Sequence, residues 1–223
     1  MLITEDLALL LTDDATGRTL TDAARVDLSL GGALLLDLIG AGLVRITGPG
    51  EEVKPGRVVV TGVSPSGDAL LDAGVAQLVG RRPAKPQEVI QRLRKDLRPA
   101  AYQRLAARGI VRASEERILG IFPTTRWPAV DSAHEARVRA ALLDVLVGGR
   151  TPTSLEATLI ALLHAIGQVP KVVPTDAMSK RDLSRRAKAV AEGNVAGDAV
   201  MQAVSAVQAG ITAALVATAA AAS

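Results

Sequence analysis

The sequence predicts a mainly α-helical protein with peripheral β-hairpins, folded as a single globular domain. Apolar residues recur at helical spacing over most of the 223 residues. Extended, alternating patterns are confined to two stretches, residues 43–61 and 109–128. Hydrophobic residues make up 48% of the chain, which is enough for a substantial core. Because the chain has one Trp, one Tyr and one Phe, that core must consist of aliphatic side chains.

The first third of the chain predicts helices on either side of a hairpin. Apolar periodicity and polar caps predict helices over residues 4–11 and 21–39. The extended patterns at residues 43–47 and 57–61 predict an antiparallel hairpin with a long tip. A further helix is expected over residues 68–79.

The second helix contains a glycine pair, Gly31-Gly32, which costs about 1 kcal/mol per residue relative to Ala. The pair predicts either a kink or the close approach of another backbone. If it splits the helix, the order helix, helix, strand, strand over residues 21–62 is that of a winged helix, a DNA-reading module. The recognition helix would then be residues 28–39, which lack Arg, Lys, Asn and Gln, and residues 1–80 have a net charge of −6. A nucleic-acid-binding regulator therefore stays as an alternative, although this charge would repel phosphate.

The middle of the chain is strongly basic. Residues 81–112 hold ten Lys or Arg and two acidic residues, a net charge of +8. Such a segment attracts a polyanionic surface, either nucleic acid or an anionic lipid leaflet. Its first part, residues 81–86, predicts a proline-stiffened connector and the best place for a subdomain boundary.

After this connector, an apolar stripe predicts a helix over residues 86–105. Pro99 should kink this helix or start a new one at its first position. Lys95 and Arg98 lie one turn apart beside the stripe, and Arg94 lies one turn before Arg98 on its other side.

The second extended stretch predicts an apolar hairpin. We expect a turn at residues 113–116 and extended chain over residues 117–128. Two of the three aromatic residues, Phe122 and Trp127, lie here within six positions. Such a hairpin is either a corner of the core or an exposed anchor.

The remainder of the chain predicts helices. One should run from Asp131 or Ser132 to Val147, and Leu155–Ile166 reads as a buried central helix. Ser179 should cap a second, smaller basic helix. Residues 203–222 carry no charge and come close to the ~20 apolar residues that span a bilayer. Their large apolar side chains recur at spacings of three and four, which favours a buried C-terminal helix.

No pattern in the sequence indicates a catalytic site. The chain has no Cys, its two His are thirty positions apart, and the nucleotide-binding, metalloprotease and hydrolase motifs are missing. His164 reads as a core or edge residue. We therefore expect a binding protein rather than an enzyme, with no catalytic residue, cofactor or metal. The acidic start of the chain is unlike a secretory signal, so we expect the protein to be cytoplasmic.

Six segments, in their order along the chain, resemble the Golgi phosphoprotein 3 family. They are LITEDLALL (2–10), GALLLDL (32–38), GDALLD (67–72), LAARGIV (105–111), FPTTRWP (122–128) and LIALLHA (159–165). The resemblance implies a largely helical, peripheral membrane protein that binds phosphatidylinositol 4-phosphate. A short chain that is rich in Ala and Arg resembles a bacterial member of this family.

The resemblance also implies residues of a basic headgroup pocket. In the family this pocket is lined by a Trp, by an Arg just before the Gly-x-Leu-Leu type helix, and by two Arg on the helix after the linker. The last two correspond to Lys95 (or Arg94) and Arg98. Asp22 stands near the Trp position and Gly31 at the first Arg position, so half of the pocket is altered.

The family's apolar hairpin, which enters the membrane or makes oligomer contacts, resembles residues 117–127, with Ile121, Phe122 and Trp127 as its apolar residues. The sequence thus predicts a peripheral protein on the inner face of the membrane, bound to an anionic, phosphoinositide-like lipid rather than to nucleic acid. We also expect a homo-oligomer that forms through residues 117–128. The sequence does not identify any other protein partner. A helical oligomeric scaffold is the third alternative.

Overall fold

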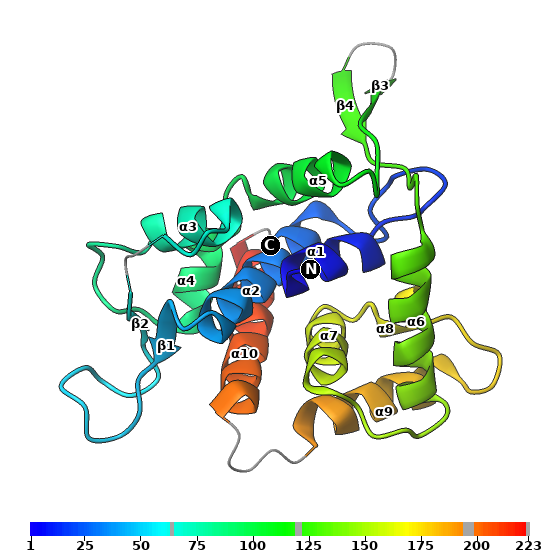
Figure 1. The fold of residues 1–223 in the computed structure, drawn as a ribbon. Coiled ribbons are helices and arrows are strands. Elements are labelled where there is room, and N and C mark those ends of the chain that lie inside the picture. Colours follow the sequence, from blue (N-terminus) through cyan, green and yellow to red (C-terminus); the bar gives the residue numbers. More distant parts are fainter. Residues whose placement is uncertain (63–64, 119–121, 194–198, 222–223) are drawn as a thin grey trace.

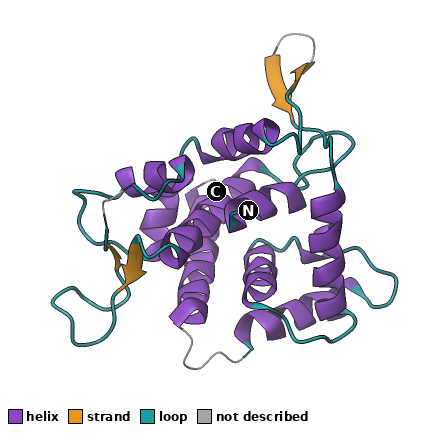
Figure 2. Cartoon of the chain, viewed as in Figure 1, coloured by secondary structure: helices purple, strands orange, loops and turns teal. Residues whose placement is uncertain are grey.

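The computed structural model describes residues 1–62, 65–118, 122–193 and 199–221. Within these ranges the chain forms ten α-helices and two two-stranded antiparallel sheets (Figures 1 and 2). The helices are α1 (Ile3–Leu10), α2 (Ala23–Gly40), α3 (Ala69–Ala76), α4 (Pro86–Leu93), α5 (Leu97–Ala107), α6 (Ala133–Leu146), α7 (Ser154–Ala165), α8 (Val169–Val172), α9 (Lys180–Glu192) and α10 (Ala199–Ala221). The strands are β1 (Val44–Ile46), β2 (Val58–Val60), β3 (Ser114–Ile118) and β4 (Phe122–Arg126). The predicted fold class, mainly α with peripheral hairpins, is confirmed.

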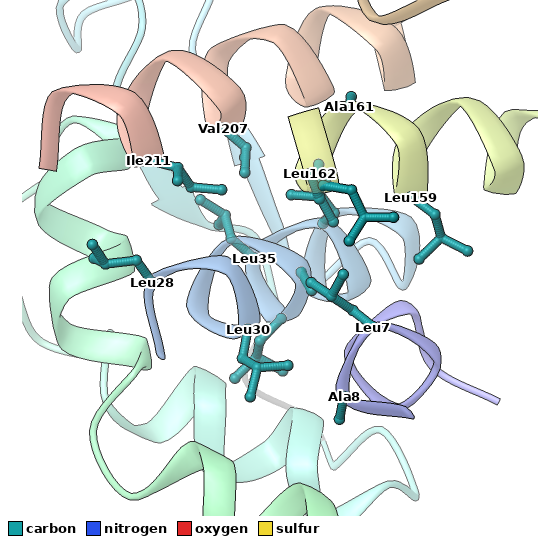
Figure 3. Packing of buried hydrophobic residues seen from close by; sticks show 14 of the residues in the cluster. Leu7, Ala8, Leu28, Leu30, Leu35, Leu159, Ala161, Leu162, Val207 and Ile211 are labelled. Carbon is teal, nitrogen blue, oxygen red and sulfur yellow. The ribbon is translucent and has the colours of Figure 1, made fainter. Parts of the chain in front are cut away.

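Helix α2 lies at the centre of the fold. Its side chains from Leu28 to Leu38 are buried, and α1, α3, α4, α5, α7 and α10 all pack against it. In Figure 3, Leu35 points toward Val207 and Ile211 of α10, while Leu30 points to the opposite side of α2. Buried residues from both sides of the 81–86 connector belong to one hydrophobic core. The prediction that the whole chain is one domain stays a prediction.

The glycine pair in α2 allows two other helices to approach it closely. A Cβ at Gly31 would lie 2.8 Å from the carbonyl oxygen of Ile90 in α4. A Cβ at Gly32 would lie 2.6 Å from Cδ1 of Ile211 in α10. Of the two explanations for this pair, the close approach of another backbone is therefore correct, and α2 continues through both glycines as one helix.

An unbroken α2 removes the structural basis for the winged-helix alternative. That alternative requires the Gly31-Gly32 pair to divide this stretch into two helices, whereas residues 23–40 form a single one. The residues expected to form a recognition helix, from Leu28 onward, are buried in the core. A helix buried on all sides cannot lie in a DNA groove.

The two helices predicted to be buried differ in how deeply they are buried. In α7, residues 157–163 are buried, but Leu155 is 43% exposed, because it lies in the first turn beyond the core. Helix α10 packs against α2, α4 and α7 through a stripe that includes Val204 and Ile211. The segment Gln202–Ala220 is long and apolar enough to cross a membrane, by length and composition alone, and 33% of it is buried here. The predicted inward stripe of α10 is confirmed, and its other face is exposed.

The basic helix predicted over residues 86–105 is two helices. Helix α4 ends at Leu93, α5 begins at Leu97, and Asp96 between them has a φ of 55°. This left-handed conformation interrupts the helix. Pro99 is the third residue of α5, so the prediction that it occupies the first position is wrong. Lys95 lies in the turn, and it does not share a helix with Arg98.

The second hairpin starts earlier than predicted. Residues 114–116, expected to form a turn, belong to β3, in which Ser114 pairs with Arg126 and Ile118 pairs with Phe122. Figure 1 shows this β3–β4 hairpin projecting from the helical body. The hairpin's tip, residues 119–121, lies outside the described residues. In the first hairpin, as predicted, β1 and β2 are antiparallel, with Val44 opposite Val60.

Buried ion pairs fix α5, which carries part of the candidate site. Nε of Arg104 lies 3.1 Å from Oε1 of Glu5 in α1, and its Nη2 lies 2.7 Å from Oδ2 of Asp68, the N-cap of α3. Arg108 adds a contact of 3.3 Å to Glu5, whose side chain is fully buried. A carboxylate buried in this way must be paired with cations, so α5 is held against both α1 and α3.

Candidate functional site

A polar cavity of about 240 Å³ lies where three parts of the fold meet. These parts are the loop before α2, the first turns of α5 and the base of the β3–β4 hairpin. The polar side chains of its lining are those of Thr19, Arg98, Thr124, Thr125 and Arg126. Two guanidinium groups from distant parts of the sequence therefore face one cavity with three hydroxyl groups, a set that suits a phosphate or carboxylate.

An aromatic pair forms one wall of this cavity. The rings of Tyr102 and Trp127 are stacked, with centroids 5.4 Å apart and planes inclined by 8°. The Tyr102 hydroxyl is buried and lies 2.6 Å from Oγ1 of Thr12. The Thr12 hydroxyl also donates a 2.7 Å bond to the carbonyl of Ala8, so the two hydroxyl groups belong to one buried hydrogen-bond network with α1. Burial raises the pKa of Tyr102, so its phenol stays protonated at neutral pH.

Trp127 is fixed by its backbone as well as by its ring. Its N–H donates to the carbonyl of Gly17 over 3.2 Å. Gly17 has a φ of 64°, and a Cβ there would lie 2.4 Å from the Trp127 nitrogen. The ring is half-buried against the core. Trp127 therefore lies at the base of the hairpin as part of a packed wall.

Arg98 reaches the cavity from α5 and is paired with a carboxylate of α2. Its Nε lies 3.1 Å from Oδ1 of Asp27, and 34% of its side chain is exposed. Burial raises the pKa of Asp27, and the attraction of Arg98 and Arg94 opposes this shift without cancelling it. Burial therefore makes the ionised form of Asp27 less favourable than that of an exposed carboxylate. This carboxylate lies beside Arg98, the cation available to an anionic ligand.

Arg126 was not among the residues predicted for the site. It ends β4, and its Nε lies 3.1 Å from Oε2 of Glu116 on the paired strand β3. Its side chain is 19% exposed. Nη2 of Arg18 lies 3.9 Å from the same carboxylate. The one sequence signal that could have identified Arg126 as a site residue is its position directly before Trp127. The sequence does not show that the base of the hairpin lies against α5.

Arg94 lies next to Gly31, the position where the resemblance implies a pocket arginine. A Cβ at Gly31 would lie 3.2 Å from both the backbone nitrogen and Cβ of Arg94. A longer side chain there would collide with α4, so this chain has no space for that arginine. Arg94 lies against the same position, and its positive charge acts on Asp27 together with that of Arg98. The positive charge missing from α2 is thus present on the end of α4.

The other predicted site residues are dispersed. Lys95 is exposed in the turn between α4 and α5 and does not line the cavity. Asp22 has a local structural role, since its side chain caps α2 by accepting a 3.0 Å bond from the N–H of Arg25. Phe122 begins β4, and Ile121 lies outside the described residues. Arg98 and Trp127 are the predicted residues that the cavity brings together.

Within the described ranges, no group of three His, Asp or Glu is arranged to hold a metal ion. His164 is half-buried in α7, and burial lowers its pKa, so it is neutral at physiological pH. This agrees with a core or edge residue.

The fold and the site define a mainly helical domain with an arginine-lined cavity at the base of a projecting hairpin. Comparison with models of protein families matches residues 3–207 to Golgi phosphoprotein 3 (GPP34). The chain belongs to this family, and the resemblance seen in the sequence is confirmed. A search among curated proteins finds no match.

Proposed function

We propose that this protein is a peripheral membrane protein that binds the phosphate-bearing headgroup of an anionic lipid. The observation that carries the proposal is that Arg98 and Arg126 line one cavity, with threonine hydroxyls, at the base of the projecting hairpin. Family membership supports the same function, because the resemblance implies phosphatidylinositol 4-phosphate as the lipid. The proposal describes a binding protein on the inner face of the membrane, not an enzyme.

The cavity has the chemistry to bind a phosphate. Each guanidinium can donate two parallel hydrogen bonds to phosphate oxygens, and hydroxyl groups such as that of Thr125 can donate to the remaining ones. Both arginines are now paired with carboxylates, Arg98 with Asp27 and Arg126 with Glu116. A dianionic phosphate competes well with a single carboxylate, particularly with Asp27, whose raised pKa disfavours its charged form.

Membrane association needs more than one cation. Each Lys or Arg near an anionic leaflet contributes about 1 kcal/mol, so stable attachment requires a second signal. Arg94 and the exposed Lys95 add charge on the side where α4 meets α5. The described strands of the β3–β4 hairpin project from the helical body (Figure 1), and β4 begins with the apolar residue Phe122. Together these features suit a protein that lies on a bilayer surface without crossing it.

Vesicle sedimentation tests the proposal. The wild-type protein should sediment with phosphatidylcholine vesicles that contain phosphatidylinositol 4-phosphate, more weakly with vesicles that contain phosphatidylinositol, and least with phosphatidylcholine alone. The double variant Arg98→Ala/Arg126→Ala should lose the preference for the 4-phosphate. Equal sedimentation with all three compositions, or a preference that the double variant retains, would refute the proposal.

A further inference from the structure

A second cavity, of about 230 Å³, lies on another part of the molecule. It is lined by β2, Leu78 in the turn after α3, the connector over residues 80–84 and α4, and it shares no lining residue with the first cavity. Three arginines line it, Arg81, Arg82 and Arg92, and the lining contains no carboxylate. The basic connector, which the sequence marks as a linker, thus forms part of a concave surface.

The connector is held in place. Its Ala84 carbonyl accepts a 2.8 Å hydrogen bond from the N–H of Val58 in β2. Nε of Arg81 donates a 2.9 Å bond to the carbonyl of Gln77, just after α3. Gly80 has a φ of 74°, which turns the chain from α3 into the connector. These contacts orient the arginines and lower the entropy cost of holding a ligand.

The register of the first hairpin directs backbone groups toward the same cavity. The N–H of Thr61 donates to the carbonyl of Leu43, and the N–H of Thr47 donates to that of Arg57. Since hydrogen-bonded and non-hydrogen-bonded pairs alternate in an antiparallel ladder, the Val58 and Val60 backbone groups face the outer edge of β2. Val58 uses its N–H to hold Ala84. Val60 is one of the lining residues of the cavity. Its N–H therefore points from the outer edge of β2 toward the connector that carries Arg81 and Arg82.

The charge around this cavity is not balanced. Between residues 80 and 92 the chain has four cationic residues and one acid, Glu88. Glu88 is exposed and lies 4.0 Å from Arg92, a weak pairing. Arg82 makes no hydrogen bond or ion pair with any residue in the described part of the chain. The apolar side chains of Leu78 and Val89 close the floor of the cavity.

We propose that this second cavity binds a small phosphate-bearing anion, independently of the headgroup site. Guanidinium groups recognise phosphate with paired hydrogen bonds, and a directed backbone N–H adds a further donor. The cavity is smaller than the roughly 300–1,000 Å³ of sites for drug-sized ligands, so it suits a phosphate monoester rather than a nucleotide or a polymer. Its apolar floor accommodates the first carbons of the ester.

The phosphate can belong to a soluble monoester or to a lipid such as phosphatidic acid, and two arms of one experiment separate these sources. In the first, phosphorus NMR follows the titration of inorganic phosphate and of glycerol 3-phosphate with the full-length protein. In the second, the protein is sedimented with phosphatidylcholine vesicles with and without phosphatidic acid. Both arms use the wild type and the double variant Arg82→Ala/Arg92→Ala.

We expect saturable binding in at least one arm, about tenfold weaker or more in the double variant, since each lost charged hydrogen bond weakens binding by at least this factor. An effect in the soluble arm identifies a free monoester, and an effect confined to vesicles identifies a lipid phosphate. The matched control Arg181→Ala/Arg185→Ala, two exposed arginines of α9, should bind as the wild type does. Urea unfolding must show that all variants are folded.

The inference is wrong if neither arm shows saturable binding, or if Arg82→Ala/Arg92→Ala binds as tightly as the wild type. It is also wrong if Arg98→Ala/Arg126→Ala abolishes the binding of soluble phosphate, because that result would assign the anion to the first cavity. This variant separates the two proposals. Binding of lipid headgroups to the first cavity can be refuted while the second cavity still binds phosphate, and binding to the second cavity can be refuted while the first still binds headgroups.

Discussion

Nε of Arg98 lies 3.1 Å from Oδ1 of Asp27, so the arginine that best matches a family headgroup residue is already paired with a carboxylate. The pair links α5 to α2 and lies at the edge of the polar cavity. Asp27 is half-buried with a raised pKa, which makes it a weak competitor for the guanidinium. We therefore expect an anionic ligand to displace Asp27 from Arg98.

Replacing Asp27 with Asn should strengthen binding to anionic vesicles. The change removes the competing charge, and since a partly exposed ion pair is worth up to about 1 kcal/mol, the gain should reach about fivefold. Asp176→Asn removes the same charge from an exposed loop and serves as the control. Vesicle partition coefficients measure both variants, and an equal effect of the two would show that overall charge alone matters.

Gly31→Ala should destabilise the fold by about 1–2 kcal/mol, because its Cβ would meet the Ile90 carbonyl oxygen at 2.8 Å. The better helix propensity of Ala, about 1 kcal/mol, offsets part of this cost. Gly40→Ala, in the same helix with nothing within 4 Å of the added Cβ, should be neutral or stabilising. Urea unfolding compares them. Equal stability of Gly31→Ala and the wild type would mean that α4 can move, and that an arginine at position 31 is compatible with the fold.

Trp127→Ala should lower the free energy of unfolding by about 2–3 kcal/mol, since it removes the stacking on Tyr102 and leaves a cavity against the core. Trp127→Phe should recover much of this loss. The sequence alternative of an exposed anchor predicts the opposite pattern, namely unchanged unfolding and lost vesicle binding. Unfolding and sedimentation of the two variants decide between them. Mass measurements in solution on the same proteins test the predicted oligomer contact through the hairpin.

Stability should fall as the pH rises from about 4.5 to about 7. Burial raises the pKa of Glu135 to about 7 despite its ion pair with Arg139, and burial raises the pKa of Asp37 to about 6. A carboxyl group with a raised pKa binds a proton more tightly in the folded state, so its stabilisation is present at low pH and is lost as the pH passes its folded pKa. Each pKa unit corresponds to about 1.4 kcal/mol.

The variant Glu135→Gln tests this pH dependence. It keeps the shape of the side chain and removes its titration, so unfolding curves should vary less with pH than those of the wild type across that window. Glu156→Gln is the contrasting control, because the hydrogen bond from Arg150 lowers the pKa of Glu156 and its contribution is lost as the pH falls. A wild-type stability that rises through the same window, with Glu135→Gln parallel to it, would contradict this assignment.

Much of the fold could be predicted from the sequence because periodicity and caps are local signals. The glycine pair in α2 predicted either a kink or a close backbone approach, of which the structure has the second, and Ser179 caps α9 as expected. Local signals failed where one residue adopts an uncommon conformation. The left-handed Asp96 divides the basic helix, so that Lys95 lies in the turn and Arg98 in α5, and nothing in the sequence around Asp96 requires this conformation.

The candidate site was harder to predict from the sequence, because contacts between elements far apart in the sequence assemble it. Arg98 was predicted from the family resemblance, but its partner Asp27 comes from a helix far away in the sequence. Arg126 enters the cavity because the base of the hairpin packs against α5 through Tyr102 and Trp127, a contact between separate elements. The second cavity likewise depends on the docking of residues 80–84 against β2.

The central claim is that Arg98 in the polar cavity, together with the neighbouring cations at the junction of α4 and α5, binds an anionic membrane surface. Its most direct test compares Arg94→Ala/Lys95→Ala/Arg98→Ala with the charge-matched control Lys180→Ala/Arg181→Ala/Arg185→Ala on the exposed face of α9. In sedimentation with phosphatidylinositol 4-phosphate vesicles, the first variant should lose most of its binding and the control should retain it. Equal binding by the two variants, whether strong or weak, would contradict the account.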